Sequence, residues 1–187
     1  MNPTVTIENL KFPIGEFSSP SEISPQQIAH WISEIESFPL HLKTSISGIS
    51  PEQLLWKYRP EGWSINQVIH HCADSHMNSF IRFKSALTEE NPTIKPYEES
   101  KWAELPDVLN APPETSIAIL EGLHFRWVLL LKSLDSKQLK RTFFHPESKK
   151  NIRLDQAIAN YAWHGNHHLA HIRQALKYQG EFNLSAS

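Results

Sequence analysis

Apolar residues recur every three to four positions in four separate stretches of this chain, the spacing that places them on one face of an α-helix. The predicted helices cover residues 24–46, 64–87, 115–134 and 154–179. One long, proline-containing connection, residues 91–113, separates the second helix from the third. Four helices with one long crossover are typical of a mainly α fold, the four-helix bundle.

Local signals mark where two of these helices begin. Ser24 followed by Pro25 is an N-cap residue followed by proline at the first helical position. Ser64 followed three residues later by Gln67 matches a capping box. Pro39 lies inside the first helix, and because proline removes a backbone N–H, we expect a kink or a split there.

The segments outside the helices differ in kind. Residues 1–23 are rich in Pro, Ser and Gly and predict an extended N-terminal arm. The remainder, residues 24–187, is expected to form a single domain. Residues 142–154 hold two short apolar runs around a turn-rich centre, which predicts a small β-hairpin before the last helix.

Composition narrows the class of protein. A chain of 187 residues, 40% hydrophobic and 20% charged, suits one globular domain. The net charge of −2 gives no basic stripe for nucleic acid, and no apolar run reaches the ~18 residues of a membrane span. The single cysteine, Cys72, excludes an intrachain disulfide, and the N-terminal residues lack a secretory pattern. We therefore expect a cytoplasmic protein.

Most of the eleven histidines fall in two groups. They are His70, His71 and His76 in the second predicted helix, and His164, His167, His168 and His171 in the last. Histidines four residues apart lie on one helix face and can share a metal ion. The pair His164 and His168 lies on the apolar stripe from Tyr161 to Ile172, whereas the other pair continues toward the more polar Gln174. We therefore predict that His164 and His168 are ligands.

A third ligand is needed, because catalytic zinc sites usually have three protein ligands and one open position. His71 shares its helix face with polar residues such as Ser75 and Asn78, which suits the mouth of a metal site. His76 lies among apolar residues and is interpreted as a core histidine, while His70 points to the surface or behind the site. Four other side chains remain open as additional ligands: Cys72, His76, His167 and His171.

Six segments of the chain resemble the DinB/YfiT-like superfamily of metal-binding four-helix bundles, and above all its YfiT branch. They are residues 12–17, 62–79, 81–84, 144–146, 161–164 and 167–172. The branch is described as metal-dependent hydrolases and is linked to bacillithiol transferases. The segments are spread over nearly the whole chain.

The resemblance implies a set of ligands and an assembly. In this family one histidine of the second helix and an HxxxH pair of the last helix hold the metal, and these positions correspond to His71, His164 and His168. One divalent ion per chain is expected, zinc first and nickel as the alternative. A homodimer in the cytoplasm is also implied. Cys72 stands where the family pattern has an aliphatic residue and is interpreted as an inert core thiol.

Three functions fit these observations. The first is a metal-dependent hydrolase, in which the ion activates water at the open position against a small-molecule substrate. No HExxH glutamate is present as a general base, and Asp74 is the nearest acid that could orient a ligand ring. For an open site we expect a pocket lined by Ser75, Asn78, Tyr161 and Arg82.

The second function is a thiol S-transferase, in which the ion binds and deprotonates a low-molecular-weight thiol. Arg82, Arg126 and Arg173 are the candidates to hold carboxylates of such a cosubstrate. The third function is a non-enzymatic stress-response module, in which the ion joins the second and last helices as a structural clamp. The sequence assigns no catalytic residue to any of the three.

Overall fold

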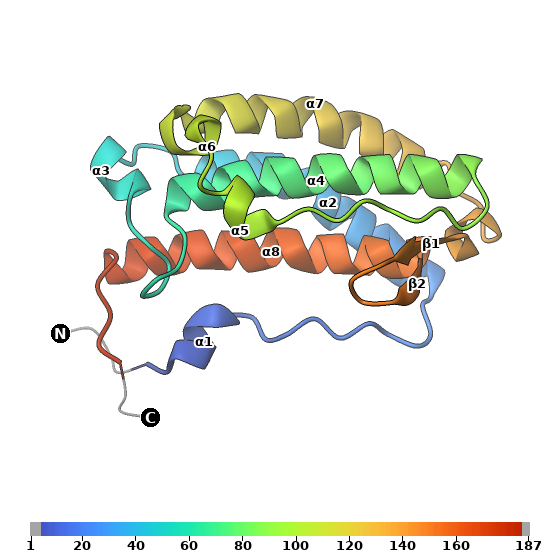
Figure 1. Cartoon of the computed structure of the whole chain (residues 1–187), viewed down its shortest axis with the longest axis horizontal. Coiled ribbons are helices and arrows are strands. Elements are labelled where there is room, and N and C mark those ends of the chain that lie inside the picture. Colours follow the sequence, from blue (N-terminus) through green and yellow to red (C-terminus); the bar gives the residue numbers. More distant parts are fainter. Residues whose placement is uncertain (1–4, 185–187) are drawn as a thin grey trace.

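Four long helices form the body of the protein in the computed structural model, which describes residues 5–184 (Figure 1). They are α2 (Pro25–Ser45), α4 (Ile65–Thr88), α7 (Pro113–Lys132) and α8 (Leu154–Tyr178). In the main contacts, α2 and α4 each pack against both α7 and α8. The mainly α bundle expected from the apolar pattern is therefore confirmed, with α2 diagonally opposite α4.

The expected helix starts and hairpin are also present. Capping boxes with both hydrogen bonds formed begin α2 and α4 at Ser24 and Ser64. Strands β1 (Thr142–His145) and β2 (Lys150–Arg153) pair antiparallel, with Phe143 opposite Ile152. None of the described helices is both long and apolar enough to cross a membrane.

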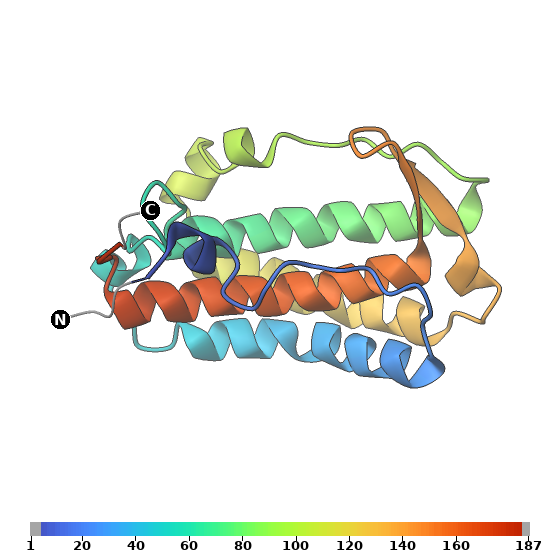
Figure 2. The same ribbon diagram turned by 90° about the horizontal axis from the view of Figure 1, so that it is seen from below.

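Short elements occupy the segments that the helical pattern left open. They are α1 (Ile7–Lys11), α3 (Pro51–Leu54), α5 (Glu99–Trp102), α6 (Pro106–Asn110) and the 3-10 helix η1 (Gln138–Lys140). The N-terminal arm is thus extended only in part, because it contains the short helix α1, whose N-terminus is capped by Thr6. After α1 the arm runs along the bundle beside α8 before it enters α2 (Figure 2).

Pro39 does not split α2, which is one continuous helix. Proline has no N–H to donate to the carbonyl of Ile35, four residues earlier. Nδ1 of His124, on α7, lies 2.6 Å from that carbonyl oxygen and replaces the missing donor. Of the kink or split expected at Pro39, the split does not occur, and a neighbouring helix satisfies the carbonyl that the proline leaves open.

The core is divided into two apolar clusters along the bundle. One contains Trp127 and Phe83 and lies toward the hairpin, and the other contains Leu42 and Ile69. Each of the four long helices contributes to both clusters. On α4, α7 and α8, histidines stand in the gap between them, so a polar layer crosses the bundle.

Candidate metal centre

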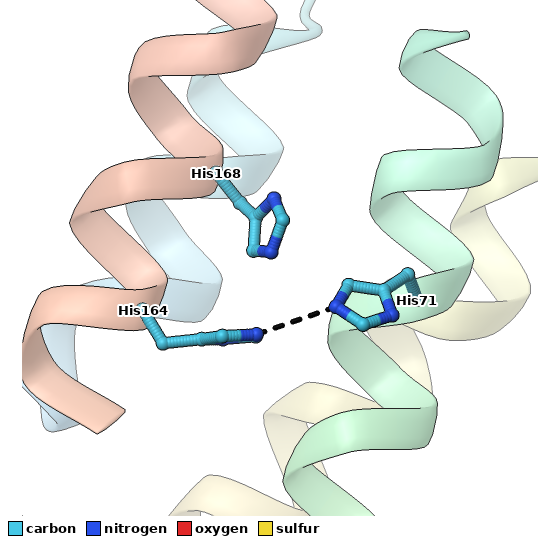
Figure 3. Close-up of side chains that lie close together, drawn as sticks. All are labelled: His71, His164 and His168. Atoms are coloured by element: carbon cyan, nitrogen blue, oxygen red, sulfur yellow. Dashed lines mark hydrogen bonds between the residues drawn. The ribbon is translucent and has the colours of Figure 1, made fainter. Parts of the chain in front are cut away.

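Three histidine rings from two helices converge in this polar layer. His71 projects from α4, and His164 and His168 project from successive turns of α8 (Figure 3). One ligand atom from each ring lies within 4.8 Å of those of the other two. Nε2 of His71 and Nε2 of His164 are 3.3 Å apart. The structure therefore brings together the three histidines selected from the sequence.

The spacing of these nitrogens fits a small divalent ion. Zinc–nitrogen bonds of about 2.0–2.1 Å in a tetrahedral arrangement place two ligand nitrogens roughly 3.4 Å apart. The 3.3 Å between His71 and His164 matches that separation. A ligand nitrogen of His168 lies within 4.8 Å of those of the other two histidines, so a small movement of its ring would bring it to the same separation.

Burial keeps the three imidazoles neutral. Desolvation, with a smaller contribution from His167, lowers the pKa of His71 to about 4. Desolvation also lowers the pKa values of His164 and His168 well below the ordinary histidine value, with nearby histidines as the next cause. Because only the neutral ring has a lone pair for a metal, the cluster is in its ligating form at neutral pH.

Each α8 histidine of the cluster is backed by a further histidine. Nδ1 of His164 lies 3.1 Å from Nε2 of His76, whose Nδ1 lies 2.7 Å from Nε2 of His124. Nδ1 of His168 lies 3.4 Å from Nδ1 of His171. Nε2 of His171 in turn lies 3.0 Å from the carbonyl oxygen of Lys11 at the end of α1.

The histidines of α4 and α8 outside the cluster of three are buried as well. His76 is a buried core histidine with both ring nitrogens hydrogen-bonded, as interpreted from the sequence. His70 is buried rather than exposed, and its ring bonds to Ser116 and to the carbonyl of Ala111, away from the cluster. His167 is also buried and stacks on Trp163, although its helix face looked polar in the sequence.

Two other candidates have no direct part in the cluster. Cys72 is fully buried in an apolar cluster, and burial raises the pKa of its thiol far above the usual value. Burial therefore keeps the thiol in its protonated form, which fits the interpretation of Cys72 as a core residue. Desolvation, and then the charge of Asp107, raise the pKa of Asp74 to about 6. Among the described hydrogen bonds none joins the Asp74 carboxylate to His71, whereas His164 and His168 are each bonded to a further histidine.

A pocket opens beside the cluster and ends on His164. Its volume is about 750 Å³, and the arm, α4, the hairpin and α8 contribute to its walls. Ser75, Tyr161 and Arg82 line it as expected, but Asn78 does not, because its amide donates to the carbonyl of Asp74. Of the three histidines His164 lines this pocket, so a small molecule in it would approach the cluster from that side.

Sequence reasoning did not show that His76, His124 and His171 are hydrogen-bonded behind the cluster. The spacing along one helix cannot show which ring on another helix it meets. One signal was available at Pro39, because a proline inside a helix leaves a carbonyl that needs a donor from elsewhere.

Four long helices around three converging, neutral histidines define a helical-bundle protein with a candidate metal centre. The chain belongs to the DinB superfamily, whose model matches residues 41–172. The resemblance seen in the sequence is thereby confirmed.

Relatives extend the match over most of the chain. The Bacillus subtilis protein named "Putative metal-dependent hydrolase YfiT" is 46% identical over 176 residues, 94% of this chain and 99% of the relative. A relative from Oceanobacillus iheyensis with the same kind of name, OB0782, is 52% identical over 169 residues, 90% of this chain and 97% of the relative.

Two solved structures share the fold. That of YfiT from Bacillus subtilis, described as "a probable metal-dependent hydrolase with an unusual four-helix bundle topology", superposes with a TM-score of 0.90 over 92% of this chain and 98% of the other. The mycothiol-dependent maleylpyruvate isomerase gives 0.56 at 13% identity, over 75% of this chain and 60% of the other. At that identity the second match shows the fold alone.

Proposed function

We propose that the protein is a metal-dependent hydrolase that holds one divalent ion with His71, His164 and His168. The convergence of three neutral imidazoles beside an open pocket carries this proposal. The names of relatives at 46–52% identity support the same class of reaction. Zinc is the first choice because three imidazoles and one open position are its usual catalytic arrangement, and nickel is the alternative.

The pocket side of the cluster suits a substrate with a polar group. When bound, the ion supplies Lewis acidity toward water and toward a substrate oxygen. Oγ of Ser75 lies 3.5 Å from Nε2 of His164 and 3.5 Å from the hydroxyl of Tyr161. These two hydroxyls would hydrogen-bond a substrate oxygen at the open position and orient it. Arg82 and Lys150 add two cationic side chains to the pocket walls.

A thiol S-transferase is the second candidate, because the pocket lacks a carboxylate base near the histidines. Among the described residues that line the pocket the only acid is Glu99, and desolvation raises its pKa. A hydrolase gains from a base that removes a proton from water. A thiol needs no such base, since coordination to zinc favours the thiolate directly.

The assembly and location belong to the same proposal. We infer a homodimer in the cytoplasm, and one exposed apolar surface supports the dimer. Leu40, Phe125 and Leu129 are 65%, 71% and 58% exposed around a groove between α2 and α7. Sedimentation at several protein concentrations tests it: wild type should sediment as a dimer and Phe125→Lys as a monomer.

Substrate screening of protein with measured metal content tests the function. Zinc- and nickel-loaded protein would be assayed with small esters and amides, and separately with small thiols plus an electrophile. Ester or amide cleavage that is lost in His164→Ala and kept in His70→Ala supports the hydrolase. Thiol consumption without cleavage supports the transferase. Retained metal without either activity supports the non-enzymatic module.

A further inference from the structure

We propose that His76 and His124 are positioning residues that fix the tautomer of His164, so that its Nε2 lone pair faces the metal centre. His171 does the same for His168. This inference rests on the proposed metal centre for its purpose. Its evidence is a set of hydrogen bonds that exists without the ion.

A backbone carbonyl of α2 fixes the position of the first hydrogen, on His124. Pro39 cannot donate to the carbonyl of Ile35, so this acceptor is free for another donor. Nδ1 of His124 lies 2.6 Å from the oxygen. A carbonyl oxygen only accepts, so Nδ1 of His124 must carry its hydrogen. Burial lowers the pKa of His124 to about 4, so the ring is neutral and its Nε2 is an acceptor.

The positions of the hydrogens on His76 and His164 follow from the hydrogen position on His124. Nε2 of His124 accepts, so the hydrogen of the 2.7 Å bond belongs to Nδ1 of His76. His76 is also neutral, because its ring is buried and both of its nitrogens meet only other imidazoles, so no acid among the described residues stabilises a second proton there. Its Nε2 is then an acceptor, and Nδ1 of His164 donates to it over 3.1 Å. Nε2 of His164 is left with a lone pair, 3.3 Å from Nε2 of His71.

A second chain of bonds gives the same result at His168. The carbonyl of Lys11, the last residue of α1, has no donor within that helix and accepts from Nε2 of His171. Nδ1 of His171 is then the acceptor for Nδ1–H of His168. Nε2 of His168 is left free for the ion. Two independent chains thus end with Nε2 lone pairs on both α8 ligands.

Packing holds the rings of the first chain in place. Phe38 stacks near both His76 and His124, at centroid distances of 5.1 and 5.6 Å. Gly165 leaves room for Phe38, since a Cβ there would lie 2.9 Å from the phenyl ring. The rings therefore cannot rotate freely to exchange donor and acceptor. A ligand histidine that carried its hydrogen on Nε2 would offer no lone pair to the site.

Nitrogen-15 NMR of the metal-free protein labelled at histidine tests the tautomers directly. Long-range couplings distinguish a protonated Nδ1 from a protonated Nε2. We expect Nδ1–H on His76, His124, His164 and His168, and Nε2–H on His171 alone among these five. A protonated Nε2 on His164 in the wild-type protein would overturn the proposal.

Matched substitutions test the consequence for the metal. His124→Phe keeps an aromatic ring but removes both hydrogen bonds. His70→Phe likewise removes a buried histidine with two bonds, but those bonds are to Ser116 and the carbonyl of Ala111 and not to the linked histidines. His124→Phe should weaken zinc binding by about 10–100-fold and populate Nε2–H on His164. His70→Phe should change neither. Equal zinc affinity in the two variants would contradict the proposal.

The two measurements separate this inference from the proposed function. If the wild type shows the expected tautomers but binds no divalent ion, the metal function fails while the hydrogen-bond order stands. If it binds zinc with three histidines but His164 carries Nε2–H before loading, the inference fails alone. The wild-type spectrum decides the tautomers even if His124→Phe does not fold.

Discussion

At the scale of single residues, the choice of His71, His164 and His168 followed from helical spacing and from the family resemblance. The stripe on the last helix selected the pair of histidines that the structure places beside His71. It did not show that His171 is buried too, because the N-terminal arm that covers it is remote in sequence. Helical spacing did not identify partners such as His124, since contacts between helices leave no periodic signal.

The ligands predict a graded set of effects on metal content. Alanine at His71, His164 or His168 removes a metal ligand. Zinc affinity should therefore fall by more than the roughly 10–100-fold typical of losing a residue that only hydrogen-bonds a ligand. His167→Ala should have the smallest effect, because its Nδ1 has no described hydrogen-bond partner and its ring stacks on Trp163. Titration with a competing chelator measures the affinities. Equal losses at all four positions would refute the assignment.

Acid should destabilise the metal-free protein through its buried histidines. Burial lowers the pKa of His71 and His124 to about 4 and, together with His167, that of His171 to about 3. Unfolded histidine titrates near 6.5, so below that pH the unfolded state binds more protons. The free energy of unfolding should be level above about pH 6.5. It should fall toward pH 4 by up to about 1.4 kcal/mol per pH unit for each histidine.

Urea denaturation at pH 7.5, 6 and 5 in the presence of chelator measures this dependence. His71→Gln removes one titrating ring and should make the decline shallower. Equal unfolding free energies at pH 7.5 and 5 would show that burial does not hold these rings neutral.

At the scale of elements, the long helices and the hairpin were predictable because their periodicity extends over many residues. The short helices α1, α5 and α6 were not, since four or five residues show no period. For Pro39 the sequence offers only the rule that proline disrupts a helix. The donor that satisfies the free carbonyl lies on α7, and the residues around Pro39 do not reveal it.

Two glycine-to-alanine substitutions should change the free energy of unfolding in opposite directions, because only one of the glycines lies at the contact between α8 and α2. In Gly165→Ala the new methyl group would lie 2.9 Å from the Phe38 ring, which is held by His76 and His124. Overpacking should cost about 1–3 kcal/mol, more than the ~1 kcal/mol gained in helix propensity. Gly122→Ala on α7 meets no atom within 4 Å and should stabilise by up to ~1 kcal/mol.

Chemical denaturation of the two glycine variants at pH 7.5 measures both effects. Zinc affinity provides a second readout, because displacement of Phe38 should disturb His76 and His124, the histidines hydrogen-bonded behind His164. A Gly165→Ala protein as stable as Gly122→Ala would mean that the helices move apart at no cost.

At the scale of the whole molecule, one chain of hydrogen bonds joins all four long helices. It runs from His164 on α8 to His76 on α4, to His124 on α7 and to Ile35 on α2. The bundle could be expected from the sequence, but this connection could not, because it needs the order of the helices around the axis.

Metal should therefore stabilise the entire bundle and not only α4 and α8. Zinc at about 100 times its dissociation constant should add about 2.7 kcal/mol, which raises the melting temperature by roughly 5–10 °C for a protein of this size. Calorimetry with and without chelator at pH 7.5 measures the shift as a single transition. A melting temperature indifferent to chelator would argue against an occupied site.

The carbonyl of Lys11 gives the short helix α1 a role in holding the metal centre together. Because His171 depends on that oxygen for its orientation, loss of α1 would leave His168 free to turn its wrong nitrogen toward the ion. A protease cut in the segment between α1 and α2 should therefore release zinc while the four helices stay folded. Bound zinc should in turn slow that cut, so the N-terminal arm and the metal protect each other.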